Sequence, residues 1–428
     1  MLNHLSSIDR QCAMNWRGLI TLMFVGVCIV PNVRAAEPLL LEQAVSRSLA
    51  SNPSLAAEAA DLEAARMRAE RLGLAPRYVV GVEAENFGGR RNLAGMNSAE
   101  TTIRLGRVIE LGGKRAARQA LGAAEVARQR NMSETARIDI TSRTTSRFIA
   151  VLAAQQRRVY AQEKVKFAET IRREVARWVA AGRNPESDLR AAEIALATAE
   201  LERENTEHIL SSAKTTLAAS WGAFSPDFTS AAGNLNELPA IDSLENLVAR
   251  LPMSTTQRAA LLEAEAIRAQ RRVALASAKP DIDVSLGVRR FEATHNQALV
   301  MSISIPLGSK PRSSLSTAEA DAQLAALESR RDAQRFESYQ TLVDRYQELM
   351  HARHEYEALR NTMLPKAEQA FAFTRRGFES GRFTFIALTQ AQRTLFELRD
   401  RSVDASVRYH TVLIEVERLT AVSPELKP

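Results

Sequence analysis

The sequence predicts a mainly α-helical protein with a small β part, in which long coiled-coil helices are joined to two β-hairpins. Three observations support this fold class. One helical pattern recurs far along the chain, four short segments alternate apolar and polar side chains, and two long stretches carry helical patterns without an internal proline. The low content of helix breakers, 18 Gly and 14 Pro among 428 residues, permits helices of this length.

The helical pattern at 182–217 recurs 199 positions later, at 381–416, and each copy begins with a Gly-Arg pair. Apolar residues in both copies recur at steps of three and four, which places them on one side of a helix. We therefore predict two structural repeats with a connector rich in Pro, Asn, Ser and Gly between them. The repeats are predicted at 36–224 and 254–428, and the connector at 225–253.

Residues 1–35 have the pattern of a secretory signal peptide. Arg17 precedes an apolar core at 19–30 that is too short to span a bilayer, and the mature protein is expected to begin at Ala36. Both cysteines fall within the signal peptide, so the mature chain would have no thiol for disulfides, catalysis or metal binding. The formal charge of +7 is spread along the chain, which argues against nucleic acid as a partner.

Each repeat contains two segments in which apolar and polar residues alternate. In the first segment, Tyr78, Val80 and Val82 fall on one face, and Gly81 and Glu83 fall on the other. About ten residues is the length of a tilted strand that crosses a bilayer, and alternation fits a wall with lipid on one side and water on the other. The predicted strands are about 77–87, 101–111, 281–291 and 298–307.

The number of predicted strands bears on assembly. Open sheet edges are not stable in lipid, so four strands per chain must close into a barrel with other chains. Two chains would supply eight strands, whose side chains nearly fill the interior, whereas three chains would supply twelve and leave room for a conduit. A homotrimer is therefore the smallest conducting assembly. An alternative of another class is a soluble periplasmic coiled-coil scaffold, in which the hairpins cover the ends of a helical bundle.

The helix after the second strand is predicted to be very long. Lys114–Trp178 contains no proline and would span about 98 Å at about 1.5 Å per residue. A second long helix is predicted from about Pro311 to Pro365. Each helix follows a strand through glycine. The turns from the β-barrel into the helices are therefore predicted at Gly112, Gly113 and Gly308.

The sequence shows no arrangement typical of an enzyme. It lacks an HExxH motif and a Ser/His/Asp arrangement, so we expect no catalytic activity, no cofactor and no metal site. Glu348, His351 and Glu355 share one face of a predicted helix, but only one histidine lies on that face. An ordinary solvated helix surface explains this group.

Four motifs, two in each repeat, carry a resemblance to a known family. They are Leu49-Ala50-Ser51-Asn52-Pro53, Glu110-Leu111-Gly112-Gly113-Lys114-Arg115, Gly381-Arg382-Phe383 and Ala391-Gln392-Arg393-Thr394-Leu395-Phe396-Glu397. Over nearly all of 36–428, the chain resembles the TolC-like outer membrane factor family, whose members are outer membrane efflux proteins. Within that family it is similar to the heavy-metal cation efflux branch, the CzcC-like branch.

The resemblance implies a TolC-like α/β-barrel. Three chains would form a 12-stranded β-barrel in the outer membrane lipid of a Gram-negative bacterium, continued by a helical barrel in the periplasm. The implied partners are a periplasmic membrane fusion adaptor and an RND-type pump of the inner membrane, which drives transport through a passive duct. We expect an exit duct for heavy-metal cations. The alternative within this class is a duct for drug efflux or type I protein secretion.

The resemblance also directs attention to the helix turns farthest from the membrane. Members of this branch commonly carry acidic residues where this sequence has Ala387 and Gln390. The first helical hairpin retains two carboxylates, and rings of carboxylates favour cations. Acids at the pore mouth are therefore expected at Glu186 and Asp188. Contact with the adaptor is expected at Gly182, Arg183, Gly381 and Arg382.

Overall fold

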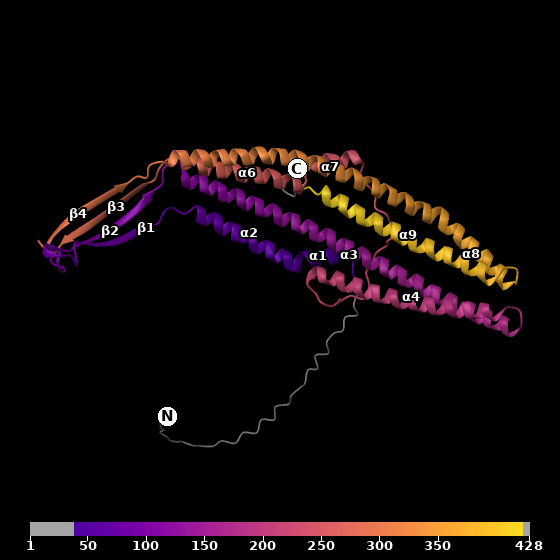
Figure 1. Cartoon of the computed structure of the whole chain (residues 1–428). Coiled ribbons are helices and arrows are strands. Elements are labelled where there is room, and N and C mark those ends of the chain that lie inside the picture. The colour runs from indigo at the N-terminus through magenta and orange to yellow at the C-terminus, as the bar shows by residue number, and fades with distance from the viewer. Residues whose placement is uncertain (1–37, 423–428) are drawn as a thin grey trace, which may run out of the picture.

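The computed structural model describes residues 38–422 as an elongated body with a small sheet at one end and helix turns at the other (Figure 1). The predicted signal peptide at 1–35 and the mature start at Ala36 lie outside the described residues. The helices are α1 (Leu41–Ser51), α2 (Pro53–Leu72), α3 (Lys114–Ala180), α4 (Glu186–Ala218), α5 (Leu244–Arg250), α6 (Thr255–Ala276), α7 (Ser309–Ala358), α8 (Leu364–Glu379) and α9 (Phe385–Leu419).

The longest helix, α3, contains 67 residues, which corresponds to about 100 Å at about 1.5 Å per residue. It runs from the sheet to the far turns, as the sequence predicted. In the described part of the chain, no helix is both long enough and apolar enough to cross a membrane.

The break between α1 and α2 follows from Asn52-Pro53. The Asn52 side chain accepts a hydrogen bond from the Ser54 amide at 2.9 Å, which caps α2, and Pro53 occupies the first helical position, where no amide hydrogen is needed. Asn52 also donates to the backbone oxygen of Ser220 at 2.7 Å. This motif therefore starts α2 and ties it to the end of α4.

The second long helix does not end at Pro365, so that part of the sequence prediction was wrong. A π-helical turn at Leu359–Met363 joins α7 to α8, and the helical path continues to Glu379. Proline clashes with the carbonyl four residues earlier in a regular helix. The wider π turn just before Pro365 accommodates that clash, because its hydrogen bonds span one more residue.

The four strands form one antiparallel sheet in the order β1-β2-β3-β4. Their bounds are β1 (Tyr78–Glu85), β2 (Glu100–Ile109), β3 (Ile282–Phe291) and β4 (Asn296–Ser304). In the register, Leu105 of β2 lies opposite Val80 of β1 and Leu286 of β3. The β2–β3 pairing joins hairpins that are far apart in the sequence, so β1 and β4 are left as the two open edges.

The helices form a wall about four helices wide. Near the sheet, α3 packs between α2 and α6, and α7 packs on α6; near the far turns, α3 packs between α4 and α9, and α8 packs on α9. The edges of the wall are therefore α2 and α4 on one side and α7 and α8 on the other. Figure 1 shows the helices nearly side by side along the long axis.

Candidate functional site

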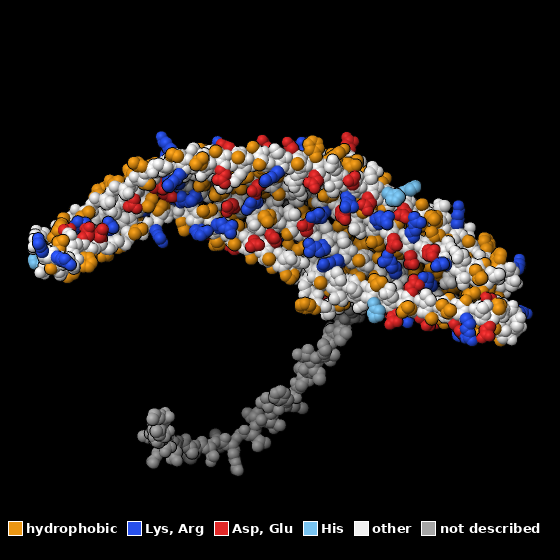
Figure 2. All heavy atoms as spheres, in the orientation of Figure 1, with side chains coloured by type: hydrophobic (Ala, Val, Ile, Leu, Met, Phe, Trp, Pro, Cys, Tyr) orange, Lys and Arg blue, Asp and Glu red, His pale blue; other side chains and the backbone are white. Residues whose placement is uncertain are grey.

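The sheet presents an apolar face to its surroundings. On this face Val80 is 70% exposed, Ile103 is 58% exposed and Leu299 is 79% exposed. The register aligns further large apolar side chains with them, so that the face extends across all four strands. Figure 2 shows hydrophobic atoms scattered over this end of the molecule. A contiguous exposed apolar surface of this kind marks a contact with a membrane or a partner.

The opposite face of the sheet is polar. Arg104 of β2 forms an ion pair with Glu83 of β1 at 3.0 Å. Arg289 of β3 forms ion pairs with Glu85 at 2.9 Å and with Glu100 at 3.0 Å. The alternation predicted from the sequence is thus present as one apolar and one polar face.

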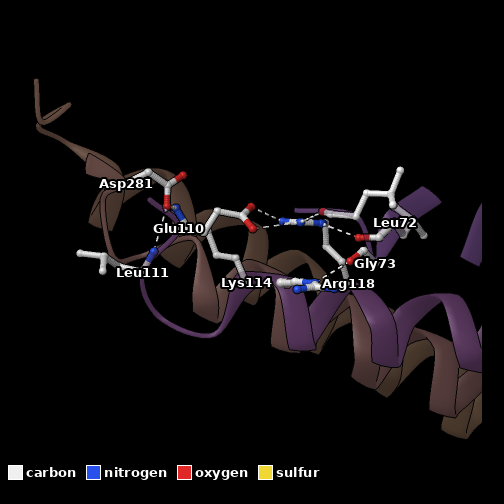
Figure 3. Close-up of polar contacts among 9 residues, drawn as sticks. Leu72, Gly73, Glu110, Leu111, Lys114, Arg118 and Asp281 are labelled. Carbon is white, nitrogen blue, oxygen red and sulfur yellow. Dashed lines mark hydrogen bonds and ion pairs between the residues drawn. The ribbon is translucent and has the colours of Figure 1, made fainter. Parts of the chain in front are cut away.

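A second cluster joins the sheet to the helices (Figure 3). Arg118 of α3 donates to the backbone oxygens of Leu72 at 2.9 Å and Leu74 at 3.2 Å, and it forms an ion pair with Glu110. Arg115 donates to the backbone oxygen of Gly73 at 2.6 Å. These carbonyls at the end of α2 have no partner within the helix, so the arginines of α3 act as its C-terminal cap.

The same junction contains a link between the two predicted repeats. Asp281, just before β3, accepts hydrogen bonds from the Leu111 amide at 3.2 Å and from Lys114 Nζ at 2.7 Å (Figure 3). Leu111 and Lys114 belong to the first repeat. One carboxylate therefore fixes the position of the β2–α3 turn relative to the strand beside it.

The turn glycines differ in their surroundings. Gly112, Gly113 and Gly308 have φ values of +80°, +73° and +89°, which favour glycine. A Cβ at Gly112 would lie 2.9 Å from the backbone oxygen of Ala276, whereas Gly113 and Gly308 face open space. The structure thus places all three at strand-to-helix turns, and only Gly112 also lies in close contact with its neighbours.

At the corresponding junction of the second predicted repeat, a serine contacts the end of the preceding helix, where the amide and hydroxyl of Ser277 also donate to the backbone oxygen of Ala274. Arg118 and Ser313 each lie five positions after the glycine that precedes their helix. Ser313 Oγ, which is buried, donates to the backbone oxygen of Ala274 near the end of α6 at 2.7 Å. A serine therefore takes the place of the arginine at the second junction, where α6 lies against α7.

The far turns contain the four residues expected to contact an adaptor. At the first turn, the Gly182 amide donates to Val179 at 2.9 Å and the Arg183 amide donates to Trp178 at 2.8 Å. At the second, the Gly381 and Arg382 amides make the equivalent bonds, both at 2.8 Å, in the pattern that commonly ends a helix at a left-handed glycine. Both arginine side chains are exposed, and neither makes an ion pair within the described residues.

The two predicted pore-mouth acids lie in the first turn of α4. Glu186 is exposed and pairs with Arg190 at 2.8 Å, and Asp188 is half-buried and accepts a hydrogen bond from Asn184 at 2.8 Å. Carboxylates at a helix N-terminus are also stabilised by the helix dipole. Both acids therefore have local structural partners, and they lie two residues apart at the end farthest from the sheet.

An aromatic cluster near these turns was not predicted. The ring of Trp178 lies 4.6 Å from that of Phe378, between centroids, and joins the α3–α4 hairpin to the α8–α9 hairpin. A Cβ at Gly377 would lie 2.1 Å from Phe383. Phe383 therefore packs directly on the backbone of α8, which gives a structural reason for the Gly381-Arg382-Phe383 motif. The only sequence signal was a glycine inside a helix.

A cavity of about 350 Å³ lies between α3, α4 and α9 near the same end. Phe167, Phe385 and Phe396 give it an apolar lining, and Lys164 at its edge forms an ion pair with Glu202 at 2.7 Å. Asp400 also lines the cavity, and burial raises the pKa of this carboxyl above its ordinary value.

This pKa direction gives a pH prediction for Asp400→Asn. Burial makes the folded protein bind this proton more tightly than the unfolded chain does. The ionised carboxylate therefore lowers the stability of the folded protein at a pH above the raised pKa, and this destabilisation is lost as the pH falls below that pKa. We expect a higher melting temperature than wild type at pH 7 and a difference that shrinks toward acidic pH, measured by circular dichroism in detergent. Asp321→Asn is the control: it breaks the ion pair with Arg271, lies outside the groups that shift the pKa of Asp400, and should give no such gain. A gain that grew in acid would contradict the prediction.

The acidic residues on the helix face that contains His351 are paired with arginines. Glu355 is paired with Arg401 at 2.9 Å, and Glu348 is paired with Arg345 at 2.7 Å. Within residues 38–422, no group of three or more metal-binding side chains comes together.

Comparison with known proteins places this geometry in a family. The model of the family "Outer membrane efflux protein" matches residues 44–223 and 254–422. The chain is 32% identical over 389 residues to the cobalt-zinc-cadmium resistance protein CzcC of Cupriavidus metallidurans, covering 90% of each protein. It is 28% identical to the nickel and cobalt resistance protein CnrC of the same organism, covering 74% of this chain and 75% of CnrC.

A solved structure shares the fold. The crystal structure of CusC superposes with a TM-score of 0.75 at 14% identity and covers 90% of this chain and 92% of CusC. This similarity extends over both the sheet and the helices. The chain has the TolC-like fold and belongs to the outer membrane efflux protein family, in its CzcC-like branch.

Proposed function

We propose that this protein is the outer membrane component of a tripartite efflux system, a passive exit duct for heavy-metal cations. The observation that carries the proposal is the sheet, whose apolar face is exposed on all four strands while its other face is polar. In a transmembrane β-barrel the apolar face would contact lipid and the polar face would contact water. We also propose that 36–224 and 254–428 are two copies of one unit.

The duct is proposed to be a homotrimer. One chain leaves β1 and β4 unpaired, and three chains would close twelve strands without an open edge. The edge helices of the wall support the same assembly, because they carry exposed apolar residues. Ile194 and Leu201 of α4 are each 68% exposed, and so is Phe336 of α7 on the opposite edge. Edges of this kind would meet between neighbouring subunits and continue the barrel into the periplasm.

The cargo is inferred from relatives. The two relatives above are named as resistance proteins for cobalt, zinc, cadmium and nickel, and the match to CzcC covers 90% of this chain. We therefore propose divalent heavy-metal cations, delivered by an RND-type inner membrane pump through a periplasmic adaptor. Drug efflux and type I protein secretion are the competing cargoes.

The test of function is a deletion in the native host. Loss of this chain should lower resistance to cobalt, zinc, cadmium or nickel, and plasmid-borne wild-type protein should restore it. Resistance to hydrophobic drugs and export of secreted proteins should stay unchanged. If metal resistance is untouched while drug resistance falls, the cargo is wrong; if the protein fractionates as a soluble periplasmic monomer, the duct itself is wrong.

We also propose that the far turns contact the adaptor, because Arg183 and Arg382 are exposed and make no ion pair within the described residues. Reversing both charges, Arg183→Glu with Arg382→Glu, should lower metal resistance without lowering the amount of trimer in the outer membrane. Arg173→Glu, an exposed change on α3 away from the turns, is the control. Full resistance in the double variant would place the contact elsewhere.

The remaining proposal concerns the pore mouth, where three copies of Glu186 and Asp188 would form an acidic ring that attracts cations. Asp188 is the sharper probe, since Glu186 is already paired with Arg190. Asp188→Ala should reduce cation selectivity in planar bilayers. Unchanged selectivity would remove this role.

A further inference from the structure

The polar face of the sheet contains two arginines whose side chains are held against the sheet, and this arrangement bears on ion conduction. In the proposed barrel this face lines the lumen, so the inference rests on the proposed function. Both arginines lie on central strands, Arg104 on β2 and Arg289 on β3. Each is held by carboxylates along the sheet surface.

Arg104 lies in a trough made by glycines. In the register it stands between Gly81 of β1 and Gly287 of β3, neither of which has a side chain. A Cβ at Gly81 would come within 3.2 Å of Arg104 Nε and 3.4 Å of its Cγ. The side chain therefore lies along the wall above Gly81 and ends at Glu83, 3.0 Å away.

Arg289 is held in a similar way by more partners. From β3 it donates to Thr102 Oγ1 at 2.9 Å, pairs with Glu100 at 3.0 Å and reaches across β2 to Glu85 of β1 at 2.9 Å. Glu85 and Glu100 stand directly opposite each other in the register, where like charges repel. The guanidinium of Arg289 offsets that repulsion and covers Thr102, which is 2% exposed.

The strand residues of this face carry a net negative charge, because there are four carboxylates and two guanidiniums. Two guanidiniums face the carboxylates of Glu83, Glu85 and Glu100, and Asp283 adds a fourth on the same face. Among the described residues, Asp283 has no ion-pair partner, and it is exposed. Three subunits would repeat this pattern around the lumen.

We propose that Arg104 and Arg289 form a retracted arginine belt, in which wall carboxylates and glycines hold both guanidiniums against the barrel and keep the bore open to cations. Glu83 is a positioning residue for Arg104, and Glu85 and Glu100 position Arg289. An arginine released from its carboxylate would extend into the lumen. Three copies would then present a positive ring to the permeating cations, which rings of arginine and lysine disfavour.

The test compares two charge-neutral substitutions of lumenal acids in planar bilayers, under a KCl gradient. Glu83→Gln removes a carboxylate and releases Arg104, whereas Asp283→Asn removes the same charge without releasing an arginine. We expect Glu83→Gln to lower the ratio of K⁺ to Cl⁻ permeability by roughly two-fold more than Asp283→Asn does. Adding Arg104→Ala to Glu83→Gln should restore the ratio and the conductance.

A second pair of variants leaves the lumenal charge unchanged. Gly81→Val would push Arg104 off the wall, and we expect a lower single-channel conductance. Gly106→Val adds the same volume to the same face beside Ser285, with no arginine in contact, and should lower conductance less. The Gly81 variant also keeps the inference testable if Glu83→Gln fails to assemble. Trimer recovery from the outer membrane is checked for every variant.

The outcomes separate this inference from the proposed function. If wild-type protein forms no channel, the duct proposal fails. If wild type conducts but Glu83→Gln behaves like Asp283→Asn, or if Gly81→Val conducts like Gly106→Val, the arginine belt is wrong and the duct proposal stands. A double variant that retains the defect of Glu83→Gln would likewise show that Arg104 is not its cause.

Discussion

Leu299→Arg is expected to abolish assembly in the outer membrane. Leu299 lies on β4 and is 79% exposed on the apolar face of the sheet. An arginine on the lipid side of a barrel near the bilayer midplane costs about 2–4 kcal/mol, and a trimer would contain three of them. The protein should be lost from the detergent-extracted membrane fraction, measured as the heat-modifiable trimer on gels, and metal resistance should fall with it.

Val300→Arg is the matched control, because the next residue along β4 points to the polar face. The same arginine would there face water opposite Gly287 of β3, so the trimer should still form. Equal loss of trimer in both variants would mean that the two faces do not differ in environment. Normal assembly of Leu299→Arg would contradict a lipid-facing role for the apolar face.

The sheet and the helices could largely be predicted from the sequence because their signals are local. Alternation in Tyr78, Val80 and Val82 depends only on neighbouring residues, and it survives in the structure as the exposed apolar face. The same holds for the helix start at Asn52-Pro53, where cap and helix are adjacent. The strand-to-helix turns were found at glycine for the same reason.

Contacts between distant segments could not be predicted from the sequence. Nothing near Arg118 in the sequence indicates that it caps α2, since Leu72 lies 46 positions earlier. The pairing of β2 with β3, which places Asp281 beside Leu111, crosses 170 positions. A local sequence pattern cannot specify such partners, because they depend on how distant segments pack together.

The helix end predicted at Pro365 was wrong for a different reason. The rule that proline ends a helix assumes regular α-helical hydrogen bonding. The π turn at Leu359–Met363 changes the local geometry. Tyr356, just before it, donates to the backbone oxygen of Asn236 in the connector at 3.1 Å, and Arg360 within the turn donates to Tyr356 Oη at 2.6 Å. Tertiary contacts thus sustain a helix that the local rule would interrupt.

Gly112→Asn is expected to destabilise the protein far more than Gly113→Asn. Asparagine tolerates the left-handed conformation, so the backbone cost is small at both positions, whose φ values are +80° and +73°. The two positions differ in the room available for a side chain. A Cβ at Gly112 would lie 2.9 Å from the Ala276 oxygen and 3.1 Å from Lys279 side-chain carbons, whereas a Cβ at Gly113 would have no atom within 4 Å.

The expected difference between the two variants is about 1–3 kcal/mol per subunit, the usual cost of overpacking. It should appear as a lower temperature for dissociation of the trimer in detergent, with Gly113→Asn close to wild type. The reason is that Ala276 ends α6 of the second repeat, so a side chain at Gly112 separates the β2–α3 turn from its neighbour. Asp281 would then lose its hydrogen bonds with the Leu111 amide and with Lys114 Nζ. Equal stability of the two variants would mean that the junction yields at this contact and that the glycine is required only for its φ angle.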